Sequence, residues 1–169
     1  MAVSIPCSLH NKVKIIPNRM ISYSWPKTPH TDIKQTEAMI QKKAFATPDA
    51  SGATGRQFVF AIILADDPLH KVVGMVGINA LVPAPSIGYG IHPDLWGKGY
   101  TSEAVRAVKD AWWRLPREAS DSEPEKLFAA CNQRNIGSVR VLQKSGFEIY
   151  REIPVAGDVV VLMSAKRPS

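Results

Sequence analysis

Two glycines, one lysine and the two aliphatic hydroxyl side chains of Thr101 and Ser102 lie close together in WGKGYTS (residues 96–102), between an apolar run and a helical pattern. Glycine weakens regular structure because its backbone loses more entropy on folding than that of other residues. Two glycines directly before a helix therefore indicate a turn that needs their freedom. The first N–H groups of a helix have no intrahelical partner, and the helix dipole attracts negative charge. The segment predicts an anion-binding site at a helix start, and a tight turn with a serine N-cap and no ligand is the alternative.

The spacing of these residues matches neither of two common nucleotide motifs. The chain has no Gly-x-x-x-x-Gly-Lys-[Ser/Thr] at this place, and no third glycine completes Gly-x-Gly-x-x-Gly. Neither a nucleoside triphosphate nor a nicotinamide dinucleotide is therefore favoured. Lys98 adds a mobile cation, and Thr101 and Ser102 could either cap the helix or bond a phosphate oxygen.

The elements around this turn predict a mixed α/β sheet with helices. Apolar runs and alternating patterns predict strands at residues 13–17, 57–64, 71–81, 87–91 and 126–131 and in the final runs FEIYREI and VVVLMSA. Helical patterns predict helices after residue 31, over about 102–114 and over 135–145. The unit from Ile87 to Cys131 is strand, helix, strand, which predicts a parallel pair with a right-handed crossover. The other strands can pair antiparallel.

The composition is that of an ordinary globular protein and excludes several classes. The 169 residues are enough for one domain, taken as residues 1–169. No apolar run approaches the roughly 20 residues that cross a bilayer, so no membrane span is expected. The N-terminus lacks the order of a signal peptide. The two cysteines, Cys7 and Cys131, have no metal-ligand spacing, so we expect no metal site and a reducing, cytoplasmic location.

The charge of the chain favours a polyanionic partner. Its formal net charge is +6, from 21 Lys and Arg against 15 Asp and Glu. The basic residues are scattered, with no run of five or more, which disfavours nucleic acid. A phosphate-rich cofactor is the better candidate.

Two segments resemble motifs of one enzyme family. IGYGIHPDLWGKGYTSEAV (residues 87–105) resembles the acetyl-CoA-binding motif of the GNAT superfamily of N-acetyltransferases, and is most similar to the branch that contains the ribosomal-protein alanine N-acetyltransferases. NQRNIGSVRVLQKSGFE (residues 132–148) resembles the second motif, Asn-x-x-Ser followed by a short helix and Gly-Phe. Two motifs at the expected separation are more specific than either alone. The resemblance implies a mostly antiparallel sheet with one splayed parallel strand pair and flanking helices.

The resemblance also implies how acetyl-CoA would bind. Backbone N–H groups from Gly97 to Ser102 would hold the CoA pyrophosphate, and the pantetheine arm would lie between the two splayed strands. Arg140 is an alternative to Lys144 for the outer phosphate. The family pattern Gln/Arg-x-x-Gly-x-Gly/Ala begins here with Trp96 and ends with Thr101, which could crowd the pyrophosphate. The expected cofactor-binding residues are Ile91, Gly97, Lys98, Gly99, Tyr100, Thr101, Ser102, Asn135 and Lys144.

The implied reaction is transfer of an acetyl group from acetyl-CoA to a primary amine. Many family members carry a tyrosine seven residues after the motif asparagine, which protonates the departing sulfur, but here that residue is Leu142. Ser138 is therefore the expected proton donor or relay, and the alternative is that it bonds only the helix start or the pantetheine amide. Strand 87–91 has no obvious carboxylate, so the alternative for the whole chain is a catalytically weak acyl-CoA-binding or regulatory module.

Several other residues have simpler explanations. Glu103 in the first helical turn stabilises the helix dipole, and His92 marks the end of a strand, with a substrate-facing role as its alternative. Trp112 and Trp113 are expected to pack in the core and at the surface, and Cys131 in the core. Loops 21–30 and 83–86 are expected to select the acceptor amine, which the motifs leave undefined.

The front of the chain departs from the family pattern. The usual first strand and the helix after it have no convincing counterpart, so the chain looks shortened there. Either one edge of the sheet is uncovered, or residues 13–16 substitute for the missing strand. Because an uncovered edge pairs with other chains, a homodimer is the expectation in the first case.

Overall fold

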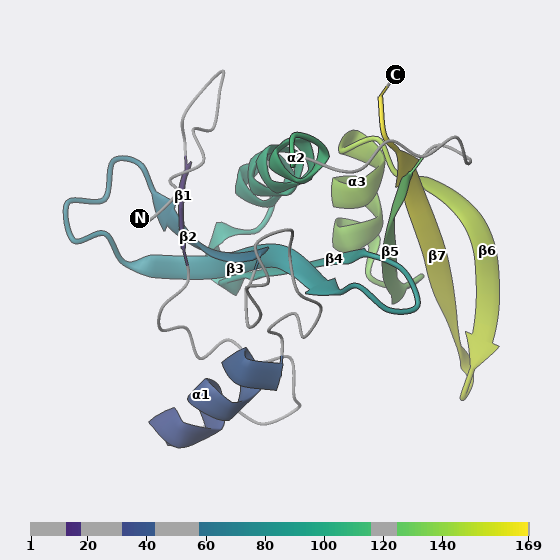
Figure 1. Ribbon diagram of the computed structural model, residues 1–169, viewed down its shortest axis with the longest axis horizontal. Coiled ribbons are helices and arrows are strands. Elements are labelled where there is room, and N and C mark those ends of the chain that lie inside the picture. The colour runs from purple at the N-terminus through teal and green to yellow at the C-terminus, as the bar shows by residue number, and fades with distance from the viewer. Residues whose placement is uncertain (1–12, 18–31, 43–57, 116–124, 169) are drawn as a thin grey trace.

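The computed structural model describes residues 13–17, 32–42, 58–115 and 125–168, and Figure 1 shows their arrangement. Within these ranges the strands are β1 (Val13–Pro17), β2 (Phe58–Leu64), β3 (Val72–Ala80), β4 (Ser86–Ile91), β5 (Lys126–Asn132), β6 (Glu148–Val155) and β7 (Asp158–Lys166). The helices are α1 (Ile33–Lys42), α2 (Tyr100–Trp113) and α3 (Ile136–Lys144), with a 3-10 turn η1 (Pro93–Leu95). In the described ranges no helix is long and apolar enough to cross a membrane.

The strands form one seven-stranded sheet in the order β1-β2-β3-β4-β5-β7-β6. Five of the neighbouring strand pairs are antiparallel: β1 with β2, β2 with β3, β3 with β4, β5 with β7, and β7 with β6. The hairpin predicted for β2 and β3 is confirmed by the pairing of Phe58 with Ile78. β4 and β5 are parallel and are connected through α2, as the strand–helix–strand pattern predicted. The predicted mixed, mostly antiparallel sheet is therefore confirmed.

β1 provides the edge strand that the sequence left open. It pairs antiparallel with β2 from Val13 opposite Leu64 to Pro17 opposite Phe60. The backbone N–H of Val13 also donates to Glu103 Oε1 at 3.4 Å, which links β1 to the start of α2. Of the two alternatives, the substituted edge strand is the one observed.

The hydrophobic core lies between the sheet and the helices α2 and α3, which Figure 1 shows on the same side of the strands. α2 contributes Ala104, Val105, Val108 and Trp112, whose spacing places them on one helical face, and all four are buried. Strand residues such as Ile62, Val76, Ile78, Leu127 and Met163 are buried against them. α1 lies apart, on the other side of the strands in this view, and its Ile33 is 55% exposed.

Candidate functional site

The glycine turn leads into α2 with its backbone in the left-handed region. Gly97 has φ +75° and Gly99 has φ +85°, which L side chains rarely adopt. Gly99 is the N-cap and no side chain caps the helix, which begins at Tyr100. The helix therefore starts two residues earlier than predicted, and the serine N-cap of the ligand-free alternative is wrong. A chain can use glycine at the N-cap because its backbone reaches the required turn without strain.

At the N-terminus of α2, the backbone N–H groups before the first helical hydrogen bond have no partner within the helix. Glu103 N–H donates to the Gly99 carbonyl at 3.1 Å, so the N–H groups of Tyr100, Thr101 and Ser102 precede the first bond of the helix. Among the described residues, a Cβ built on Gly97 or Gly99 would meet no atom within 4 Å. The turn thus faces open space, with backbone donors and the positive end of the helix dipole directed into it.

Side chains around this helix start differ in exposure. Lys98 is exposed, whereas Thr101 is half-buried and Ser102 is buried. Tyr100 is half-buried and packs against the hydrophobic core. Arg106 Nε donates to the Ser102 carbonyl at 3.2 Å within the helix. Side-chain contact with a ligand is therefore most accessible to Lys98, while Tyr100 and Ser102 would contribute through their backbone.

At the end of β4, some of the backbone N–H and C=O groups point away from β3. His92 N–H donates to the Val73 carbonyl at 2.8 Å, and Gly74 lies opposite Ile91. Bonded and non-bonded positions alternate along an antiparallel pair, so the backbone groups of Tyr89 and Ile91 point toward β5. The Ile91 carbonyl accepts the indole N–H of Trp96 at 3.2 Å. The Ile91 N–H is the group that faces the space between β4 and β5.

β4 and β5 separate soon after they begin. Their register pairing is limited to Ser86 opposite Phe128, beside a bond of 2.9 Å from Phe128 N–H to the Pro85 carbonyl. Further along, the hydroxyl of Tyr89 donates to the Ser138 carbonyl of α3 at 3.1 Å. The predicted splayed pair is therefore present, with α3 at its wide end.

Tyr89 was not singled out from the sequence. Burial raises the pKa of its phenol to about 12, although hydrogen bonding from the Ser138 side chain lowers that pKa in part. The period-two alternation of β4 places Tyr89 on the same face as the buried Ile87, which is a signal that could have identified it. This alternation could not predict the contact of Tyr89 with Ser138, because the two residues are 49 positions apart in the sequence.

α3 begins at Ile136 and holds the second predicted cluster. Asn135 is the N-cap, and its Oδ1 accepts the N–H of Ser138 at 3.0 Å. The structure therefore brings Asn135 and Ser138 together next to Tyr89. Lys144 is exposed in the last turn of α3, roughly 9 Å along the axis from Ser138. Asn135 thus has a structural task as the helix cap, in addition to any contact with a ligand.

Other predicted residues have local roles. His92 Nδ1 accepts the N–H of Asp94 at 3.4 Å and caps the η1 turn. Burial raises the pKa of the half-buried Cys131 thiol, which keeps it protonated and unsuited to attack. Trp112 and Trp113 are 7% and 6% exposed, so the surface position expected for one of them is wrong. Residues 21–30, expected to select the acceptor, lie outside the described residues.

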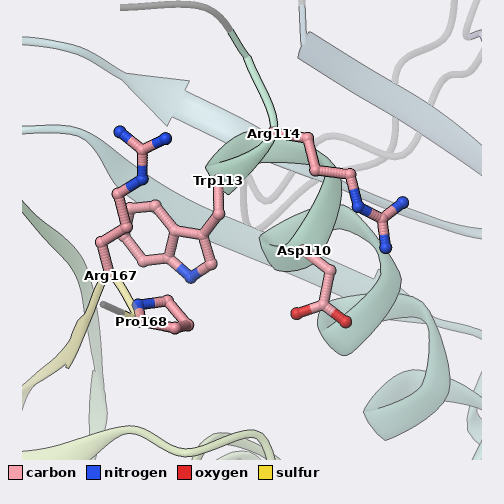
Figure 2. A pocket seen from close by; sticks show the side chains of 5 residues that line it. All are labelled: Asp110, Trp113, Arg114, Arg167 and Pro168. Atoms are coloured by element: carbon pink, nitrogen blue, oxygen red, sulfur yellow. The ribbon is translucent and has the colours of Figure 1, made fainter.

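A hollow lies at the opposite end of α2 and is separate from this site (Figure 2). It has a volume of about 320 Å³ and is lined by Asp110 and Trp113 of α2, by the C-cap residue Arg114, and by Arg167 and Pro168 after β7. α2 rises about 1.5 Å per residue, so this hollow is roughly 20 Å from the glycine turn. It is not close enough to share a ligand group with the N-terminus of α2.

Comparison with known proteins identifies the family. The acetyltransferase (GNAT) domain family matches residues 13–148, and the chain belongs to it. An uncharacterized N-acetyltransferase p20 from Bacillus licheniformis is 31% identical over 127 residues, which are 72% of this chain and 62% of that protein. The chain thus spans less than two thirds of the curated relatives that it matches.

Two solved structures show the same fold at low sequence identity. The ribosomal-protein-S5-alanine acetyltransferase from Vibrio fischeri has a TM-score of 0.59 and 19% identity, covering 98% of this chain and 97% of that chain. AAC(6')-Ib, solved with "Parmomycin" and acetyl-CoA, has a TM-score of 0.59 and 15% identity, covering 85% of this chain and 78% of that one. These likenesses establish the GNAT fold.

Proposed function

We propose that this chain is an acetyl-CoA-dependent N-acetyltransferase that transfers an acetyl group to a primary amine. The observation that carries the proposal is the open N-terminus of α2, behind two left-handed glycines, at the end of a strand that separates from its parallel neighbour. Family membership supports the class of reaction. Acetyl-CoA would supply the acetyl group as an activated thioester.

The residues at the glycine turn fit the pyrophosphate of CoA. Backbone N–H groups from Gly97 to Ser102 would donate to its oxygens, and Lys98 would add a cation at the exposed side. Glycine leaves the space in front of the backbone open, since no atom of the part of the chain that the structure describes lies within 4 Å of a Cβ built there. Lys144 would meet the outer phosphate.

The separation of β4 and β5 fits an extended chain with amide groups. The Ile91 N–H would donate to the pantetheine arm, in the place where a neighbouring strand would otherwise bond. Its carbonyl is already bonded to Trp96, so we assign only the N–H to this task. Asn135 would contact the arm at the other wall, next to Ser138.

The chemical step requires three contributions from this chain. The acceptor must be held as a neutral amine, because only then does its nitrogen have a lone pair to form the new C–N bond. A backbone N–H of β4 would donate to the carbonyl oxygen as negative charge develops on it, a contribution of about 3 kcal/mol where one such donor has been removed elsewhere. The C–S bond then breaks, and the Ser138 hydroxyl would give or relay a proton to the sulfur. The attacking nitrogen would lose one proton, through water, to the solvent or back to Ser138, which leaves a neutral amide and the free CoA thiol.

We place the chain in the branch of the ribosomal-protein alanine N-acetyltransferases. The motif around WGKGYTSEA supports this, as does the fold shared with the Vibrio fischeri enzyme. A peptide with an N-terminal alanine is therefore the first acceptor to test. A homodimer would not form through the edge of β2, because β1 already covers that edge.

The test combines binding with turnover. Acetyl-CoA at 100 times its Kd should stabilise the protein by about 2.7 kcal/mol, which raises Tm by roughly 5–10 °C. Thiol release should follow when acetyl-CoA is mixed with a panel of amines that includes peptide N-termini, polyamines and aminoglycosides. Stabilisation by CoA without thiol release on any amine would favour the binding module. Stabilisation by DNA and not by acetyl-CoA would reject the proposal.

A further inference from the structure

Tyr89 is the side chain that crosses from β4 to α3 where the two parallel strands have separated. Its hydroxyl donates to the Ser138 carbonyl at 3.1 Å, although the two residues are 49 positions apart in the sequence. The thiol of Cys131 on β5 is close enough to raise the pKa of the Tyr89 phenol electrostatically. The phenol therefore has β5 and the first turn of α3 as its neighbours across the gap.

The hydrogen bond attaches Tyr89 to a particular turn of α3. Asn135 Oδ1 holds the N–H of Ser138 at 3.0 Å, while Tyr89 holds its carbonyl at 3.1 Å. Both backbone groups of Ser138 are thus fixed from outside the helix, which limits the positions that its side chain can occupy. In the described residues, register pairing of β4 with β5 ends at Ser86 and Phe128, so the strand ladder itself does not set the width of the gap here.

We propose that Tyr89 is a positioning residue: its ring sets the width of the gap between β4 and α3, and its hydroxyl holds the Ser138 turn in place for the reaction. This inference rests on the proposed function, since the gap is where the thioester would lie. Tyr89 acts through Ser138 and does not itself exchange a proton with the substrate.

The hydrogen bonding of the phenol argues against a direct role as an acid. Burial raises the pKa of the Tyr89 phenol to about 12, so the hydroxyl keeps its proton. Its proton is already donated to a carbonyl, and the phenol stays neutral at physiological pH, which suits a fixed hydrogen-bond donor.

The experiment is a double-mutant cycle of Tyr89→Phe and Ser138→Ala. Tyr89→Phe keeps the ring and removes only the hydroxyl, so kcat should fall roughly fivefold to tenfold, less than the roughly 10²-fold that a 1 Å misplacement can produce. The Kd of acetyl-CoA should change by less than about twofold. In the Ser138→Ala background, Tyr89→Phe should change kcat by less than about twofold, because the group that it positions is gone. Tyr150→Phe, at an exposed residue of β6, is the matched control.

A second measurement does not depend on turnover. Hydrogen exchange in the first turn of α3 should accelerate in Tyr89→Phe and remain unchanged in Tyr150→Phe. Additive losses of kcat in the cycle, or an unchanged kcat in Tyr89→Phe, would overturn the proposal. If the parent protein neither binds acetyl-CoA nor turns over, the proposed function fails, and the exchange experiment alone decides: unchanged exchange in α3 then rejects Tyr89 as the residue that holds this turn.

Discussion

Replacing Gly99 by alanine, with Gly157→Ala as the comparison, separates the backbone strain at the glycine turn from the role of that turn in binding. Gly99 has φ +85°, and Gly157 in the hairpin between β6 and β7 has φ +84°. A Cβ at either position would meet no atom of the described residues within 4 Å, so neither substitution creates a clash with this part of the protein. The two variants therefore carry the same conformational penalty at two distant sites.

The magnitude of this penalty follows from the left-handed conformation. An L residue there loses roughly 1–2 kcal/mol relative to glycine. For a protein of this size, that loss lowers Tm by roughly 2–8 °C. We expect Gly99→Ala and Gly157→Ala to lose about the same stability, in the absence of any ligand, when both are measured by thermal unfolding.

Binding should distinguish the two variants. The methyl group of Gly99→Ala extends into the space where the pyrophosphate would approach the N–H groups of α2. We expect its Kd for acetyl-CoA to rise at least tenfold, or about 1.4 kcal/mol, whereas Gly157→Ala should bind like the parent. Calorimetry at a temperature where both variants are folded measures this. Equal Kd values for parent and Gly99→Ala would remove the pyrophosphate from this turn.

Three further substitutions test other parts of the site. Ser138→Ala should lower kcat by roughly 10²-fold with little change in the Kd of acetyl-CoA; a normal kcat would show that solvent protonates the sulfur, and a loss of affinity alone would assign Ser138 to binding. Leu142→Tyr, which restores the family's usual tyrosine, should lower the free energy of unfolding by about 1–3 kcal/mol, because Leu142 is 1% exposed in the core; unchanged stability in denaturant unfolding would contradict this. Burial raises the pKa of Tyr89 to about 12, so its contribution to stability is fully present below about pH 10 and is lost as the pH rises through about 12. In urea unfolding, the free energy of unfolding of Tyr89→Phe should therefore decline less than that of the parent between about pH 10 and about pH 12. Equal declines in the two proteins would show that the phenol is not buried.

Local sequence patterns predicted the elements well because each pattern has a physical cause. The apolar spacing in α2 and the β-branched runs of β2 and β3 are consequences of burying one face or both faces of an element. The chain order also fixed the parallel pair. The start of α2 was placed too late, because serine and threonine are the usual N-caps, whereas a left-handed glycine takes that position here.

Contacts between distant segments were beyond these patterns. The bond from Tyr89 to Ser138 depends on how far β4 and β5 separate, which no local spacing encodes. The Trp96 indole bonded to the Ile91 carbonyl is a similar case, because the η1 turn directs it. Leu142 is a third case. The sequence shows only that the family's usual tyrosine is absent at this position, whereas the structure shows that Leu142 is buried in the core.

The single register pair between β4 and β5 also has a consequence for how the molecule melts. It divides the sheet into a block of β1 to β4 and a block of β5, β7 and β6, whose hydrogen-bonded ladders do not continue into one another. The blocks are joined through the contact of α2 with α3 and the bridge from Tyr89. A cofactor bonded to both walls would act as a substitute strand. We expect it to couple the two blocks into one cooperative unit, so that ligand-free protein unfolds over a broader temperature range than the complex.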